Sequence, residues 1–125
     1  MYLHLPYRYF HHYSINLKKT LHRAVDTIDK TIESVQLGIE LGFDTILSSG
    51  GENTALNGLS VLADMQLLAA GKIEVMPGSG INSITAKEIL NSHHFDWIHS
   101  SCSIQKNADR YTDVESIKNL KNAIN

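Results

Sequence analysis

The stretch that decides the fold is Glu74-Val75-Met76-Pro77-Gly78-Ser79-Gly80-Ile81, together with the helical pattern that follows it. It is typical of a short strand, a tight turn and then a helix. Gly78 and Gly80 allow the backbone to turn sharply and to bring its N–H groups close to a ligand. A helix that begins at Asn82 or Ser83 would direct its free N–H groups and the positive end of its dipole at the same point. The motif alone leaves two interpretations open, an anion pocket or a turn that needs glycine only for its geometry.

Composition narrows the class of protein around this motif. A chain of 125 residues, 42% hydrophobic and 19% charged, is typical of one small globular domain. The net charge of −2 gives no basic surface for nucleic acid or an anionic membrane, so we expect neither partner. The lone cysteine, Cys102, excludes an internal disulfide and suits a reducing compartment. With neither a membrane-length apolar run nor the apolar core of a secretory signal, the sequence predicts a soluble, cytoplasmic protein.

The first 18 residues differ from the rest of the chain. They contain five of the nine aromatic residues and three of the seven histidines, His4, His11 and His12, and they show no helical or strand period. The histidine spacing fits no standard metal site. We therefore expect residues 1–18 to form an irregular arm, which either has little order or packs on an exposed sheet edge, and residues 19–125 to form the folded unit.

From Thr20 onward, predicted strands alternate with predicted helices. The strands are expected at 20–26, 45–49, 72–76 and 97–101, and the helices at 29–41, 54–70, 82–91 and 114–124, with a polar link over 105–112. Asp29 is the expected N-cap of the first helix. The expected buried face of the second helix is Leu56, Leu59, Ala63, Leu67 and Ala70. This pattern predicts an α/β fold of four β-α units with parallel strands and right-handed crossovers.

Each predicted strand carries polar or glycine residues at its C-terminal end. In parallel α/β folds this edge of the sheet is where ligands bind, so the chemistry of the four units converges there. That placement favours the anion-pocket interpretation of the opening motif. The residues predicted to bind the anion are Ser49, Gly50, Gly51, Gly78, Ser79, Gly80, Ser100 and Ser101.

Three residues near this edge are candidates for proton transfer, namely His22, Asp26 and His99. Strand alternation would place His22 and Asp26 on one face, and a histidine–aspartate pair suits acid–base catalysis near neutral pH. The alternative is that they are buried polar residues that satisfy each other. Arg23 falls on the opposite face, where we expect a structural ion pair, for example with Asp44.

Several motifs occur in a fixed order along the chain: His22-Arg23-Ala24-Val25-Asp26, Leu41-Gly42-Phe43-Asp44-Thr45-Ile46-Leu47-Ser48-Ser49-Gly50-Gly51, Ala55-Leu56-Asn57-Gly58-Leu59, Val75-Met76-Pro77-Gly78-Ser79-Gly80-Ile81 and His99-Ser100-Ser101. Together they resemble the C-terminal half of the CutC copper-homeostasis family. The resemblance implies a TIM (β/α)8 barrel, a cytoplasmic setting and a role in copper handling. It also makes the opening motif the loop after the seventh barrel strand, where TIM barrels frequently bind phosphate. It implies no settled reaction, and we assign none.

The chain departs from the family in ways that have physical consequences. A closed barrel needs eight strands and about 200 residues or more, and four β-α units supply half of it. Trp97 stands where the family usually has a glutamate, and Glu74 stands at a usually apolar position. A half-barrel has two unpaired edges and an uncovered inner face. We therefore expect a homo-oligomer that restores the missing half; the alternative is a truncated chain without activity of its own.

Copper gives the first of two function hypotheses. Cuprous ions prefer thiolate and thioether ligands, and the chain offers Cys102, Met76 and its histidines. A single thiol forms a two-thiolate Cu(I) site only where two chains meet, and Cys102 can equally be a small buried residue. The first hypothesis is a copper-homeostasis protein that binds or handles copper. The second is a remnant of a TIM-barrel enzyme that binds a small phosphorylated or otherwise anionic metabolite.

Overall fold

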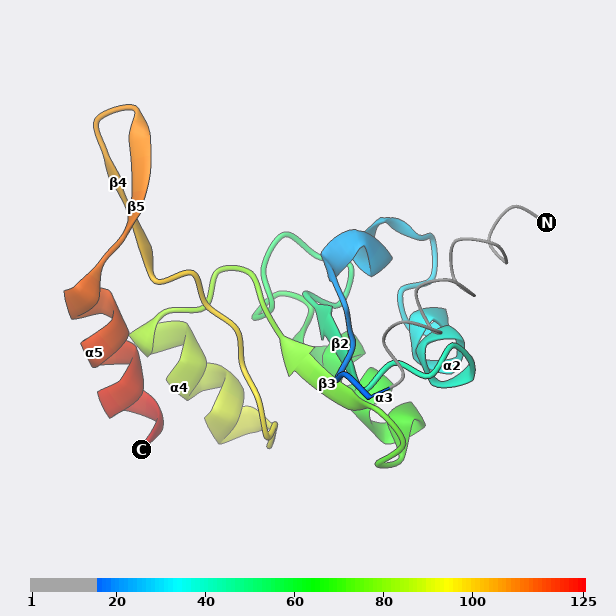
Figure 1. Cartoon of the computed structure of the whole chain (residues 1–125). Coiled ribbons are helices and arrows are strands. Elements are labelled where there is room, and N and C mark those ends of the chain that lie inside the picture. The colour runs from blue at the N-terminus through cyan, green and yellow to red at the C-terminus, as the bar shows by residue number, and fades with distance from the viewer. Residues whose placement is uncertain (1–15) are drawn as a thin grey trace.

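A parallel sheet of three short strands forms the centre of the structure. The computed structural model describes residues 16–125, and in it β1 (Thr20–Leu21), β2 (Thr45–Ser48) and β3 (Glu74–Pro77) lie in the order β1-β2-β3 (Figure 1). Residue 20 pairs with residue 45, and residue 45 pairs with residue 74. A helix lies in each connection between these strands, so the predicted α/β class with parallel strands is confirmed.

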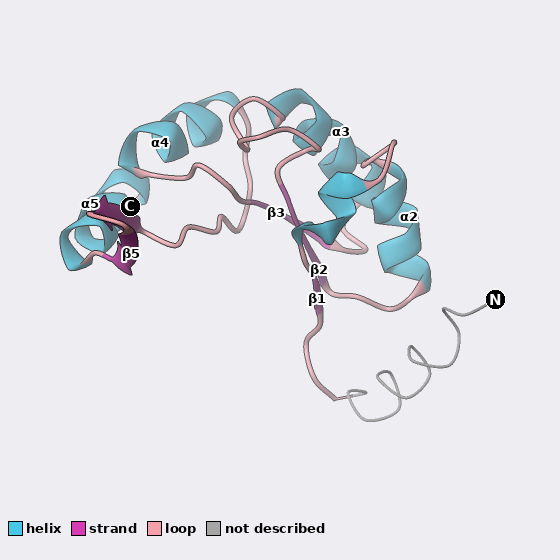
Figure 2. Ribbon diagram, turned by 90° about the horizontal axis from the view of Figure 1, so that it is seen from above, coloured by secondary structure: helices cyan, strands magenta, loops and turns pink. Residues whose placement is uncertain are grey.

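Four α-helices accompany the sheet: α2 (Glu33–Glu40), α3 (Leu59–Ala69), α4 (Ser83–Ser92) and α5 (Val114–Ile124). Figure 2 shows α2, α3 and α4 along a curved line on one side of the strands, with α5 beyond α4. Neighbouring helices are in contact along this line, α2 with α3 and α4 with α5. The helices thus form a layer whose two ends are α2 and α5.

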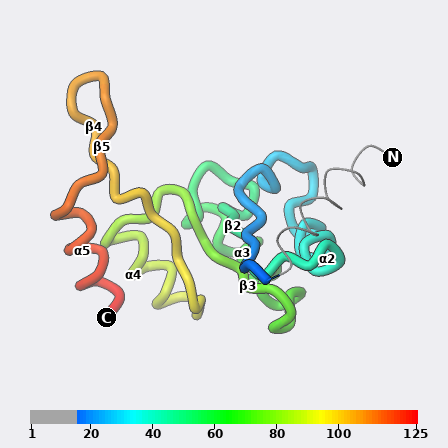
Figure 3. The backbone as a smooth tube through the Cα atoms, in the orientation of Figure 1, coloured from blue at the N-terminus to red at the C-terminus, as the bar shows by residue number. Residues whose placement is uncertain are grey.

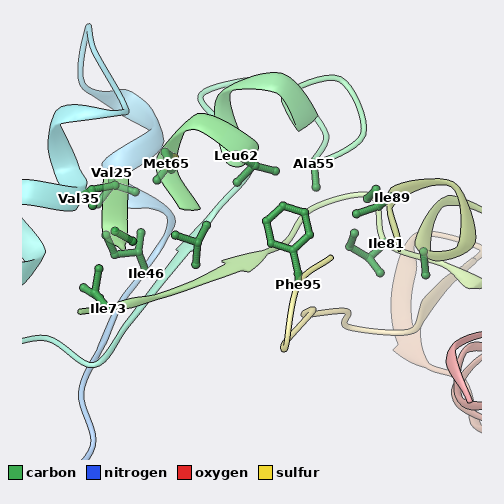
Figure 4. Close-up of a cluster of buried hydrophobic side chains, with 13 residues drawn as sticks. Val25, Val35, Ile46, Ala55, Leu62, Met65, Ile73, Ile81, Ile89 and Phe95 are labelled. Carbon is green, nitrogen blue, oxygen red and sulfur yellow. The ribbon is translucent and has the colours of Figure 1, made fainter. Parts of the chain in front are cut away.

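The hydrophobic core lies between the sheet and this helix layer (Figure 4). Ile46 of β2, Leu62 and Met65 of α3 and Ile89 of α4 are completely buried. Gly38 lets α2 approach the sheet closely, because a Cβ there would lie 2.8 Å from Cδ1 of Ile73. Burial of each such large side chain stabilises the fold by about 1.5–3 kcal/mol.

The predicted strand at 20–26 is mostly wrong. The strand ends at Leu21, and a 3-10 helix, η1 (Arg23–Thr27), follows it. Nδ1 of His22 accepts a hydrogen bond from the Ala24 N–H at 3.0 Å, and the Thr27 hydroxyl donates to the Ala24 carbonyl at 2.7 Å. These local partners satisfy backbone groups that a longer strand would have paired across the sheet.

Helices α2 and α3 begin later than predicted. The N-cap of α2 is Ile32 rather than Asp29, and it makes no side-chain cap hydrogen bond. The segment before α3 packs against the loop after β2, where a Cβ on Gly58 would lie 1.9 Å from the Ser49 carbonyl oxygen. A bend at residue 54 and turns at 55–58 therefore precede the helix, and α3 begins only at Leu59.

The predicted buried face of α3 is wrong in part, since Leu56 and Leu59 pack against the core but Leu67 and Ala70 are exposed. Leu67 is 81% exposed, whereas the buried residues of this helix are Leu62, Met65 and Ala69. The sequence of α3 is apolar on most sides, so its period alone did not define which face meets the sheet.

The predicted fourth strand, 97–101, is reduced to a single parallel bridge between Gly78 and His99. The His99 N–H donates to the Pro77 carbonyl at 2.8 Å. Side chains still alternate along this segment, since Ile98 packs against the core and Trp97 is largely exposed.

The predicted polar link over 105–112 is instead an antiparallel hairpin of β4 (Ser103–Lys106) and β5 (Asp109–Thr112). Asn107 has the positive φ of 57° that its tight turn requires. Figure 3 shows the hairpin projecting from the chain just before α5, whose predicted range is confirmed.

Two further expectations can be compared with the structure only over the residues that it describes. His4, His11 and His12, and most of the predicted arm, lie outside residues 16–125. Within that range, none of the helices combines the length and the apolar character needed to cross a bilayer.

Candidate anion-binding site

The Asp26 carboxylate lies in a nest of hydrogen-bond donors beyond the C-terminal end of β2. Its side chain is only 7% exposed. One oxygen accepts from the Ser48 hydroxyl at 2.5 Å and from the Gly51 N–H at 3.2 Å. The other accepts from the N–H and hydroxyl of Ser49, both at 3.0 Å, and from Nε of Arg23 at 2.9 Å. The loop after β2 therefore already binds an anion, and that anion belongs to the chain itself.

These contacts determine the protonation of Asp26. Burial alone would raise its pKa, but hydrogen bonds from Ser48, Ser49 and Arg23 outweigh burial and lower the pKa from its usual value. Asp26 is therefore a carboxylate at neutral pH. In the structure it orders the loop and neutralises Arg23.

Three of the predicted anion-binding residues, Ser49, Gly50 and Gly51, form this nest rather than an open pocket. Gly50 donates its N–H to the Ser48 hydroxyl at 2.9 Å, while the N–H groups of Ser49 and Gly51 point at Asp26. Gly50 and Gly51 have φ values of 72° and 79°, which glycine adopts without strain. An external ligand for these three residues stays a prediction, and the neighbouring loop offers the open space.

The turn after β3 is fixed by its contacts. The Gly78 N–H donates to the Ser48 carbonyl at 2.9 Å, and the Ser79 hydroxyl donates to the Asn53 carbonyl at 2.8 Å. Gly80 has a φ of 67°, and a Cβ there would lie 2.8 Å from the Thr54 methyl group. Glycine at position 80 is thus required by backbone geometry and close packing, whether or not a ligand binds.

Helix α4 begins where the sequence predicts, with Asn82 as its N-cap, but its N–H groups are not free as expected. The Asn82 side chain accepts from the N–H groups of Ile84 and Thr85, and the Thr85 hydroxyl accepts from the Asn82 N–H. Within the described chain this capping box leaves only the Ser83 N–H of the first turn without a partner. The helix terminus alone is therefore a weak anion site.

A cavity of about 470 Å³ lies beside this turn. It is lined by Arg23, Leu47, Ser79, Gly80, Ile81, Asn82, Ser83, His99, Ser100, Ser101, Cys102, Ser103, Arg110, Ser116 and Asn119. None of these residues is acidic, two are arginines and six are serines. The lining thus offers positive charge and hydroxyl donors, which is the chemistry that recognises a phosphate or carboxylate.

Both arginines escaped the sequence-based site prediction. The structural ion pair of Arg23 is confirmed, but its partner is Asp26 rather than Asp44, which pairs with Lys18 at 2.8 Å. Nη2 of Arg23 also donates to the Ser49 hydroxyl at 3.1 Å. Arg110 of β5 donates from Nη2 to the Ser103 hydroxyl at 2.9 Å. A motif contains Arg23, whereas no local signal marked Arg110, because only the hairpin brings it to the cavity.

The structure separates the predicted proton-transfer residues. His99 lines the cavity, but His22 does not and instead caps η1 through Nδ1. Of the remaining predicted anion-binding residues, Ser79, Gly80, Ser100 and Ser101 line the cavity and Gly78 does not. The hydroxyl of Ser100 donates to the Ile81 carbonyl at 2.6 Å, which ties the segment after the Gly78–His99 bridge to the turn.

The two predicted copper ligands do not meet. Cys102 lines the cavity described above, whereas Met76 lines a second cavity, of about 650 Å³, together with Glu74 and Trp97. Across residues 16–125 there is no cluster of three or more histidine, cysteine, aspartate or glutamate side chains arranged to bind a metal. Within the described residues, Cys102 and Met76 therefore do not form a Cu(I) site in one chain.

Comparisons with known proteins agree with the motifs. The CutC family model matches residues 9–104. A family protein CutC of Sinorhizobium medicae is 42% identical over 96 residues, which are 77% of this chain and 39% of that protein. The copper homeostasis protein cutC homolog of Caenorhabditis elegans is 32% identical over 117 residues, covering 82% of this chain and 47% of that protein.

Solved structures give the same result for the fold. CutC from Streptococcus agalactiae superposes with a TM-score of 0.62 at 24% identity, over 69% of this chain and 43% of that one. The chain thus spans less than half the length of the relatives that it matches. The order of motifs, the family model and the curated relatives lead to one conclusion: this chain belongs to the CutC family.

Proposed function

We propose that the 470 Å³ cavity binds a small anionic ligand, of the class of phosphorylated metabolites, in what corresponds to half of a TIM barrel. One observation carries the proposal. Arg23 and Arg110 line a cavity that has no acidic residue in its wall. Asp26 neutralises part of the charge of Arg23, whereas Arg110 has no ion-pair partner among the described residues, so an anion would complement its charge.

The place of the cavity in the fold supports the same ligand class. It adjoins the turn after β3 and the segment that bridges to it, at the carboxyl ends of parallel strands. The TIM barrel implied by the family resemblance makes these the loops after its seventh and eighth strands. Phosphate groups are frequently bound there.

Titration with inorganic phosphate, followed by calorimetry or by phosphorus NMR, tests this function. We expect saturable binding of one phosphate per chain, weakened about tenfold or more in Arg110→Gln, because that variant loses a charge-assisted hydrogen bond. Lys106→Gln is the matched control, since it removes one positive charge from the same hairpin outside the cavity. It should leave the affinity nearly unchanged.

Two results would contradict the proposal. One is the absence of saturable binding in the wild-type chain. The other is an equal loss in Arg110→Gln and Lys106→Gln, which would show that phosphate responds to overall charge rather than to this cavity.

A catalytic role of His99 is part of the same proposal. Among His22, Asp26 and His99, it is the residue that lines the ligand cavity. An imidazole there can act as a general acid or base toward a bound ligand. His99→Gln should keep phosphate affinity within a few-fold, because it retains a polar side chain in the cavity wall.

Copper handling in the cytoplasm is the second candidate function. The Caenorhabditis elegans relative is named a copper homeostasis protein, and the Cys102 thiol lines the same cavity as His99. One chain supplies one thiolate, so a two-coordinate Cu(I) site would use Cys102 from two chains. Titration with Cu(I) against a chromogenic chelator should then give one ion per two chains and no binding in Cys102→Ser. Equal binding by both proteins would exclude the thiol as a ligand.

A further inference from the structure

The last helix of the chain presents an uncovered apolar stripe. Val114, Ile117, Lys121 and Ile124 are spaced at i, i+3, i+7 and i+10, which places them along one side of α5. The three apolar members are 65%, 45% and 41% exposed, and α5 contains no buried residue. Such an amphipathic helix normally gains its stability by covering this face.

The helix at the other end of the layer presents a complementary stripe. Glu33, Leu37 and Glu40 are spaced at i, i+4 and i+7 on α2, and Leu37 is 48% exposed. An exposed leucine flanked by two carboxylates on α2 thus faces solvent, as do exposed isoleucines flanked by Lys118 and Lys121 on α5. Glu33 also pairs with Lys30 at 3.4 Å, and Lys118 pairs with Glu115 at 3.8 Å, but all four side chains are exposed and can exchange partners. The acidic side chains beside Leu37 thus complement the basic ones beside the isoleucines of α5.

The sheet also ends in two open edges. Within the described chain, β1 pairs only with β2, and the segment around His99 pairs only with β3, through its one bridge. The strands run parallel, so one of these edges can pair in parallel with the other edge of a second copy. In Figure 2 the helices α2 and α5 lie at opposite ends of the helix layer.

We propose that two copies of this chain associate around a two-fold axis and close each other's open ends. The α2 helix of each copy lies beside α5 of the other, and β1 of each lies along residues 97–101 of the other. Leu37 packs against Ile117 and Ile124, and the carboxylates of α2 face the lysines of α5. The same contact forms twice, so the assembly closes as a dimer. This inference does not depend on which ligand the cavity binds.

The second copy would also cover the inner face of the sheet. Glu74, Met76 and Trp97 line the 650 Å³ cavity on the described chain, and all three side chains remain at least partly exposed. A largely exposed tryptophan beside a methionine is an apolar surface of the kind that interfaces bury. Closure of the dimer removes it from water.

Two charge-reversed variants test this geometry. In Glu33→Lys/Glu40→Lys both stripes become basic, and in Lys118→Glu/Lys121→Glu both become acidic. Each variant alone should dissociate about tenfold or more readily than the wild-type dimer, because like charges then meet at both contacts. Mixed in equal amounts, the two variants present opposite charges at both contacts, and we expect a 1:1 heterodimer to form. Sedimentation velocity and native mass spectrometry measure both results.

One variant serves as a control, and several outcomes would contradict the proposal. Lys106→Glu, on the hairpin, should dimerise as the wild type does, and circular dichroism shows whether each variant is folded. The proposal is overturned if the wild-type chain is a monomer at every concentration, if it forms open-ended polymers, or if mixing the reversed variants yields no heterodimer. A dimer that the reversals leave unchanged would also overturn it, since α2 and α5 would then lie outside the interface.

Discussion

At the scale of single residues, Asp26 has the densest set of interactions at the candidate site. Its carboxylate accepts hydrogen bonds from Arg23, Ser48, Ser49 and Gly51 while nearly buried. Asp26→Asn keeps the size of the side chain but removes its charge. The new amide NH2 group is a donor that faces N–H and O–H groups, which are donors themselves, so it cannot replace the lost hydrogen bonds. We expect the free energy of unfolding to fall by about 2–4 kcal/mol in urea denaturation at pH 7. The control Asp29→Asn changes an exposed carboxylate and should stay within about 0.5 kcal/mol of wild type.

The same carboxylate predicts how stability depends on pH. The pKa of Asp26 is lower in the folded chain than the usual 3.8, so the folded state favours the charged form. Its stabilisation is therefore complete above about pH 4 and is lost as the pH falls through the folded pKa. Asp26→Asn should lose less stability than wild type below pH 4. Because Asp44 and Asp113 also have lowered pKa values, some slope should remain, and two parallel curves would contradict the assignment to Asp26.

Substitutions of two glycines allow the effect of steric crowding on stability to be measured apart from the effect of backbone strain. Gly58 has an ordinary φ of −89°, but a Cβ there would lie 1.9 Å from the Ser49 carbonyl oxygen. Gly71 has a φ of +75° and no heavy atom within 4 Å of its Cβ position. We expect Gly58→Ala to cost about 3 kcal/mol or more and Gly71→Ala about 1 kcal/mol, measured by thermal or urea unfolding. A larger loss in Gly71→Ala would show that the loop after β2 can move away from Gly58.

At the scale of elements, substitutions of Asn82 can distinguish its role as the N-cap of α4 from its effect on ligand binding in the cavity. Asn82→Ala removes the cap and should cost about 1 kcal/mol of stability. Asn82→Asp keeps an acceptor for the Ile84 and Thr85 N–H groups, so its stability should remain near wild type. Its new negative charge lines the cavity, however, and should weaken phosphate binding about tenfold. If Asn82→Asp is as unstable as Asn82→Ala, the side-chain cap is not what orders this helix start.

Elements with strong local signals were the predictable ones. The strands β2 and β3 and the helices α4 and α5 lie within two residues of their expected bounds, because strand alternation, helical periodicity and turn glycines are local features. The strand at 20–26 failed because Asp26 meets a loop 22–25 residues further along, which alternation cannot show. The 97–101 strand was reduced because its segment has one neighbour in the described chain and pairs with it at one residue.

The sequence predicted residues of the candidate site only where they lie at the end of a predicted strand or directly after it. Ser79, Gly80, His99, Ser100 and Ser101 were found from their positions after strands, and all of them line the cavity. Arg110 lies in a stretch that the sequence predicts to be a polar link. The structure forms a hairpin there, which brings Arg110 to the same cavity, so only the tertiary structure identifies it. At the nest around Asp26 the local signal was misleading, because the glycine-containing loop that suggests a site for an external anion instead binds a carboxylate of the chain.

At the scale of the whole molecule, the exposed apolar residues determine what we expect of its stability. The chain has the CutC fold over the part that it matches, and its described residues leave Leu37 of α2 and the apolar stripe of α5 exposed. A monomer of this form would keep that apolar surface in water. Burial by a second copy stabilises the folded state by mass action, which gives the dimer a thermodynamic signature separate from its mass.

That signature is a thermal midpoint that rises with protein concentration. For two chains of this length that fold and associate together, a tenfold increase in concentration should raise the midpoint by roughly 3 °C, because dilution favours the separated, unfolded chains. Lys118→Glu/Lys121→Glu should show a lower midpoint at high concentration and little dependence on concentration. Calorimetry over a hundredfold range measures both. A wild-type midpoint that stays constant while the chain sediments as a dimer would mean that each chain is stable by itself, and that the stripes on α2 and α5 contribute little to folding.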